Sequence, residues 1–160
     1  MFFKKKVSVE DYCTRNFVPL FSTERETTWE ALRRACNDSA LSAVEAQLYY
    51  KHLRAVFIQL MLIGVAKNCG MDASSDAHLF VSMYLKEHNH SEIDEISNGY
   101  SRAFQSSGTD GIREMVLHFA DSLTEGKLQP ETVEQLYVEF YGILRIFFDD
   151  FKSFKLLPLG

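Results

Sequence analysis

The densest group of side chains that could bind a metal ion lies between Glu87 and Glu92, where two histidines alternate with other polar residues. In extended backbone, alternate side chains point to the same side, so His88 and His90 could present their imidazoles together. Imidazole and carboxylate are common ligands of transition metals. A di-iron bundle, however, needs two Glu-x-x-His pairs and a glutamate from each of two more helices, and this chain offers only Glu87 with His90. The pattern favours a solvated loop over a metal site, and we expect no cofactor.

A second candidate group is polar and lies within an otherwise apolar stretch. Glu45, His52 and Gln59 are seven residues apart, a spacing that places them along one slowly drifting line of a helix. His52 and Gln59 fall where that helix is predicted to be buried, so their polar atoms need hydrogen-bond partners. Tyrosine hydroxyls or backbone carbonyls supply such partners in most proteins. The alternative is an apolar ligand pocket, in which these side chains orient a small polar group.

Motifs for nucleophilic or phosphate chemistry are absent from the sequence. It contains no G-x-S-x-G, no P-loop and no G-x-G-x-x-G. The three cysteines, Cys13, Cys36 and Cys69, form no C-x-x-C motif. Their odd number, and the lack of an apolar secretory segment near the start, favour a reduced, cytoplasmic setting. We expect a protein without enzymatic activity.

Charge is unequally distributed along a chain whose formal net charge is −5. Residues 1–70 contain ten Lys and Arg against seven Asp and Glu, whereas residues 71–160 contain seven against fifteen. An acidic half repels phosphate backbones, so we expect no nucleic-acid partner. The apolar stretch Val56–Ala66 covers about 16 Å as a helix, too short for a bilayer core of about 30 Å, so we expect no membrane partner either.

The elements that must position these side chains show the helical period. The longest runs over residues 39–68 and changes from amphipathic to apolar on every side, which predicts a central helix surrounded by others. Lys51 and Arg54 fall on the predicted solvent side of its first half. Gly70 should end it, since glycine adopts the left-handed conformation at little cost.

Further segments repeat the helical period, and no alternating strand pattern is present. The first residues, Met1–Lys6, are expected to be frayed, and the mostly apolar residues Lys155–Gly160 are expected to dock on either surface of the last helix. The sequence predicts an all-α, single-domain bundle of about seven helices over residues 1–160, packed around the helix at 39–68. The other helices are predicted near residues 8–17, 27–36, 74–85, 91–104, 109–125 and 130–154.

The last predicted helix carries more apolar side chains than one core contact can cover. It is either a second buried column of the monomer or, through its aromatic flank, a homodimer interface, because interface cores favour Tyr and Phe. The candidate interface residues are Tyr137, Tyr141, Phe148 and Phe151. We therefore expect a cytoplasmic interaction or regulatory protein that forms a homodimer, the alternative being a binding module for an apolar small molecule or a metal.

Overall fold

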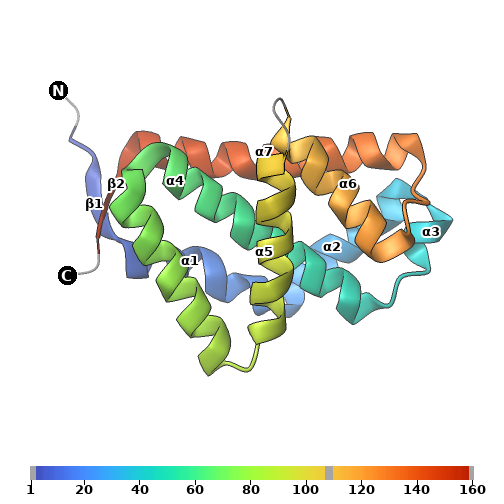
Figure 1. The fold of residues 1–160 in the computed structure, drawn as a ribbon, viewed down its shortest axis with the longest axis horizontal. Coiled ribbons are helices and arrows are strands. Elements are labelled where there is room, and N and C mark those ends of the chain that lie inside the picture. The colour runs from blue at the N-terminus through green and yellow to red at the C-terminus, as the bar shows by residue number, and fades with distance from the viewer. Residues whose placement is uncertain (1–2, 107–109, 159–160) are drawn as a thin grey trace.

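The protein is a bundle of helices arranged around one long helix, α4 (Figure 1). The structure is a computed structural model that describes residues 3–106 and 110–158. The predicted all-α class, with a long helix at its centre, is confirmed. In chain order the elements are β1 (Lys5–Ser8), α1 (Val9–Phe17), the 3-10 helix η1 (Val18–Phe21), α2 (Thr23–Cys36), α3 (Ser39–Ser42), α4 (Ala46–Glu87), α5 (Ser91–Ser106), α6 (Gly111–Thr124), α7 (Pro130–Ser153) and β2 (Phe154–Leu157).

The central helix begins later than its sequence pattern predicted. Ser39 starts the one-turn helix α3, and the chain turns before α4. Glu45 then caps α4, its carboxylate accepting hydrogen bonds from the backbone N–H groups of Gln47 and Leu48. A side chain that accepts the free N–H groups of a first turn favours a helix start at that point. Glu45 is therefore a capping residue at the surface.

The central helix also bends where the sequence predicted its end. Gly70 has φ of 85°, a conformation that favours glycine, and it interrupts the regular helix as expected. Helical residues resume directly after it, so the second helical stretch begins a few residues before the helix predicted near residues 74–85. Ser74 is buried within α4. The two halves of α4 consequently run in different directions (Figure 1).

The apolar stretch of α4 forms the core together with α7. From Val56 to Val65 every residue is buried except Phe57, which is partly buried, so the predicted dry half of the helix is confirmed. By length and composition α4 could cross a membrane, but 67% of its most apolar window is buried inside the protein. Such burial is consistent with the core helix of a soluble protein.

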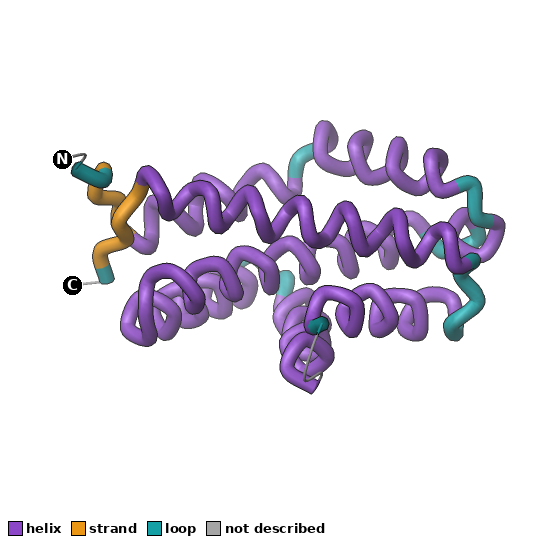
Figure 2. The backbone as a smooth tube through the Cα atoms, turned by 90° about the horizontal axis from the view of Figure 1, so that it is seen from above, coloured by secondary structure: helices purple, strands orange, loops and turns teal. Residues whose placement is uncertain are grey.

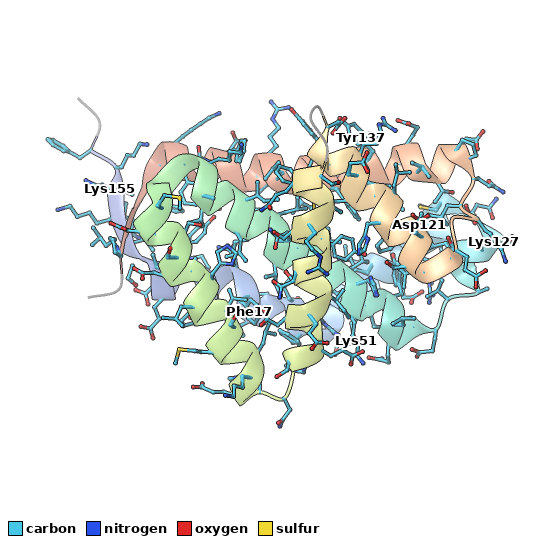
Figure 3. The ribbon with its side chains drawn as sticks, in the orientation of Figure 1. Phe17, Lys51, Asp121, Lys127, Tyr137 and Lys155 are labelled. Carbon is cyan, nitrogen blue, oxygen red and sulfur yellow. The ribbon has the colours of Figure 1, made fainter. Side chains whose placement is uncertain are left out.

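Arg54 is buried, and its prediction as a solvent-facing residue was wrong. Its Nη2 lies 2.8 Å from Oε1 of Glu26, and its Nε donates a hydrogen bond to the carbonyl oxygen of Leu20. Lys51, one turn earlier, stays at the surface, where it pairs with Glu92 (Figure 3). The guanidinium of Arg54 also lies over the aromatic rings of Phe21, Trp29 and Tyr50.

Two four-residue strands near the chain ends form a parallel pair, which the sequence did not predict (Figure 2). Lys5 pairs with Phe154, and Val7 pairs with Leu156; the last two side chains are buried. Four residues are too few to show a clear alternation of polar and apolar side chains. The predicted frayed start is therefore wrong for Lys5 and Lys6, while Met1, Phe2, Leu159 and Gly160 lie outside the described part of the chain.

Candidate functional site

An apolar groove of about 1070 Å³ lies between α2 and α7. Figure 2 shows α2 at the upper right, running beside α7. Trp29, Leu32 and Ala35 come from α2, and their spacing is that of a core-facing helix stripe. Leu32 is only partly buried and Ala35 is exposed. Further apolar lining residues are Leu53 from α4 and Val138, Phe140, Ile143 and Ile146 from α7.

The groove exists because α2 and α7 are held by contacts outside it. Near one end, the Oδ2 atom of Asp38 accepts hydrogen bonds from the backbone N–H of Gln129 and the hydroxyl of Thr132, at the start of α7. Towards the other end, the ion pair of Glu26 with Arg54 holds α2 against α4. The α2 residues lining the space between are partly small, Ala31 and Ala35 among them. The helices α2 and α7 therefore stay apart in this region, and mostly apolar side chains line the space between them.

The outer side of α7 carries exposed apolar residues along the edge of this groove. Val138 is 68% exposed and Ile146 is 63% exposed, with Gly142 midway between them. Residues four apart lie on one face of a helix, so these three residues form what we call the outer ridge. The ridge lies opposite the buried face of α7, which consists of Leu136, Phe140, Leu144, Phe147 and Phe151.

The predicted interface residues lie on a different flank of α7 from the groove, and they are not equally accessible. Tyr137 is partly buried beside α6, where the Arg113 guanidinium lies 4.5 Å from the centre of its ring (Figure 3). Tyr141 is exposed, and Phe148 is partly buried; both line a shallow depression of about 280 Å³. Phe151 is only 4% exposed, so it is a core residue of the single chain and offers no free surface.

The outer ridge was not identified from the sequence. Val138 was not identified as a surface candidate, because one apolar residue on a helix says little about its exposure. Gly142 gave the clearest available clue, since glycine destabilises the interior of a helix. The self-association that the sequence suggested stays a prediction, now with a better-defined surface.

His52 and Gln59 are buried and find their hydrogen-bond partners on α5. Nδ1 of His52 lies 2.8 Å from the hydroxyl of Tyr100, and the hydroxyl of Ser97 donates to Oε1 of Gln59. Burial, with a smaller contribution from the nearby His118, lowers the pKa of His52 to about 4, so the imidazole is neutral at pH 7. Glu45 caps α4 at the surface and does not join them. The alternative of a ligand pocket at these residues stays untested, and none of the three lines the groove.

His88 and His90 are each held by a different aromatic ring. The ring of His88 stacks on Tyr84 at 4.0 Å, and its Nδ1 lies 2.8 Å from the carbonyl oxygen of Tyr84. The ring of His90 stacks on Phe21 at 4.5 Å. Within residues 3–106 and 110–158, no group of three or more His, Cys, Asp or Glu side chains is placed to hold a metal ion. The stacking contacts therefore account for the positions of both imidazole rings.

No protein-family model, curated protein or solved structure significantly matches this chain. Its function can therefore be inferred only from its own geometry. The apolar groove and two strongly exposed apolar side chains, Val138 and Ile146, both belong to α7 and its surroundings. This region is the best candidate site.

Proposed function

We propose that the protein acts without enzymatic activity, as a cytoplasmic interaction or regulatory protein that self-associates through α7 and the adjoining groove. The observation that carries the proposal is the apolar groove of about 1070 Å³, edged by exposed Val138 and Ile146. Contiguous exposed apolar surface usually marks an interaction site, because it is otherwise unfavourably hydrated. Three unpaired cysteines, two of them buried, support a reducing compartment.

The shape of the groove favours a polypeptide as its occupant. It is open, and its walls are two whole helices, which suits another helix laid along it. Its volume is at the upper limit of the 300–1,000 Å³ or so typical of small-molecule pockets. An apolar small molecule is the second candidate, because the lining is mostly apolar with a few charged groups at its rim, such as Arg25 and Glu131.

A second copy of the chain suits this surface better than an unrelated partner. A two-fold contact needs one surface that is complementary to itself, because each copy presents the same residues. Here α7 provides an apolar ridge, and the groove beside it provides a hollow. When two copies meet, α7 of each copy can therefore pack along the apolar α7 surface of the other, at the edge of the groove.

Native mass spectrometry of the protein purified from its own host tests this proposal. Self-association predicts a dimer whose mass equals two chains. A monomer with a defined additional mass would favour the small-molecule alternative. A monomer without additional mass, at protein concentrations of about 10–50 µM, would contradict both forms of binding.

A further inference from the structure

Gly142 lies in the middle of α7, although no contact within the described part of the chain requires a glycine there. A Cβ atom built on Gly142 would meet no heavy atom within 4 Å. By contrast, a Cβ on Gly64 would lie 2.9 Å from the Cβ of Phe147, so Gly64 is needed for helix packing. Glycine destabilises the interior of a helix relative to alanine. Its presence at position 142 is explained if another backbone approaches from outside the chain.

The neighbours of Gly142 point to a helix as the approaching element. Val138 and Ile146 lie one turn before and one turn after it, both more than half exposed. A glycine between two apolar side chains forms a notch into which a second helix can pack, with side chains on either side of the crossing. Val138 lies four positions before Gly142, and Ile146 lies four positions after it. The order of apolar residue, glycine and apolar residue is therefore the same whether the helix is followed from its N-terminus or from its C-terminus.

We propose that two copies of the chain associate about a two-fold axis, through an antiparallel crossing of their α7 helices at Gly142. This inference rests on the self-association proposed above and names its geometry. Gly142 of one copy faces Gly142 of the other, so the two backbones approach closely. Val138 of each copy comes opposite Ile146 of the other, and both apolar side chains leave the water.

The charges along α7 favour the antiparallel direction over the parallel one. From Pro130 to Tyr141 the helix contains three glutamates and no Lys or Arg, whereas the part after Gly142 contains Arg145 and Lys152 together with Asp149 and Asp150 and so carries no net charge. An antiparallel crossing brings Glu139 of one copy to the level of Arg145 of the other. A parallel crossing would instead place the two acidic halves side by side, which is unfavourable.

The direction of the crossing can be tested by cysteine cross-linking in a Cys69→Ser background, which leaves only the buried Cys13 and Cys36. Val138→Cys and Ile146→Cys chains, distinguished by a tag, are mixed and mildly oxidised. The antiparallel crossing predicts a disulfide between the two different chains and little cross-linking of either variant alone. Cross-linking of each variant with itself, with no disulfide between the two different variants in the mixture, would overturn the proposal and indicate a parallel pair.

The close approach at Gly142 is tested by sedimentation equilibrium of Gly142→Ala and Gly142→Leu. Both substitutions should leave the monomer folded, because the position is open, and both should weaken the dimer. We expect a rise of about tenfold or more in the dissociation constant for Gly142→Leu, with a smaller rise for Gly142→Ala. An unchanged constant in a dimeric protein would overturn the crossing but leave self-association standing. A monomeric wild type would overturn both.

Discussion

The backbones of α4 and α7 meet at Gly64 and Phe147, where a Cβ on the glycine would lie 2.9 Å from the Cβ of the phenylalanine. Any side chain at position 64 forces these helices apart. Gly64→Ala should therefore lower the free energy of unfolding by about 1–3 kcal/mol, measured by urea denaturation. The matched control is Gly142→Ala, which should raise the stability of the monomer by about 0.5–1 kcal/mol at concentrations below dimerisation. A stabilised Gly64→Ala variant would contradict the packing.

Asp38 joins the starts of two helices. Its Oδ1 accepts hydrogen bonds from the backbone N–H groups of Ala40 and Leu41, and its Oδ2 accepts from Gln129 N–H and the Thr132 hydroxyl. Asp38→Ala should lower the free energy of unfolding at pH 7 by about 2–4 kcal/mol, since it removes a cap and leaves donors unpaired. Thr132→Val, which removes only one of these donors, should cost less.

The contribution of Asp38 should depend on pH. Burial raises the pKa of its carboxyl, but the hydrogen bonds from Gln129, Thr132, Leu41 and Ala40 more than offset this, so the pKa lies below its usual value. A carboxyl whose pKa is lower in the folded state than in the unfolded state stabilises the fold at pH values above the unfolded pKa of about 3.9. This stabilisation is lost as the pH falls through the folded pKa. Urea denaturation should show the wild type and Asp38→Ala differing most at neutral pH. A difference that persists unchanged to pH 2 would contradict the lowered pKa.

Arg54 and Lys51 lie one turn apart on α4 but should respond differently to removal of their charge. Arg54→Met should cost about 2–4 kcal/mol of unfolding free energy, because the guanidinium is buried and Glu26, its partly exposed partner, would be left unpaired. Lys51→Met should change stability by at most about 0.5 kcal/mol, since its ion pair with Glu92 is exposed to solvent. Thermal and urea denaturation measure both. Equal losses in the two variants would contradict the burial of Arg54.

His52 should make the protein less stable below neutral pH. Burial, with a smaller contribution from His118, lowers its pKa to about 4, against about 6.5 in an unfolded chain. Between these values the unfolded chain binds the proton more tightly. The free energy of unfolding should thus be constant above about pH 7 and fall as pH drops from about 6.5 towards 4. Nuclear magnetic resonance should show the His52 imidazole still neutral at about pH 5.5, and His52→Gln should flatten the profile. A His52 that titrates near 6.5 would show that it is solvated.

The fold could be predicted largely from local patterns. The helical period is repeated within each segment, so α1, α5, α6 and α7 could be found without knowledge of their neighbours. The dry half of α4 was likewise visible as a stretch apolar on all sides. The pair β1 and β2 could not be found, because four residues carry little periodicity and their partner lies at the opposite end of the chain.

The candidate site was harder to predict because it depends on contacts between helices. The pattern around Arg54 cannot show that Glu26 and three aromatic rings from other segments enclose it. Leu32 and Ala35 have the spacing of a core stripe, and only the separation of α2 from α7 leaves them in an open groove. The glycine at position 142, in the middle of a long helix, was the one clue available from the sequence alone.

Self-association through the outer ridge is the central claim, and sedimentation equilibrium tests it most directly. The wild type at about 10–100 µM should be a dimer that dissociates on dilution. Val138→Glu with Ile146→Glu should give a folded monomer, whereas Leu79→Glu with Met83→Glu, which places the same charges on exposed apolar positions of α4, should remain dimeric. Tyr141→Glu with Phe148→Glu shows whether the aromatic flank contributes. A wild type that stays monomeric over this range, or a dimer that survives the charges at Val138 and Ile146, would contradict the claim.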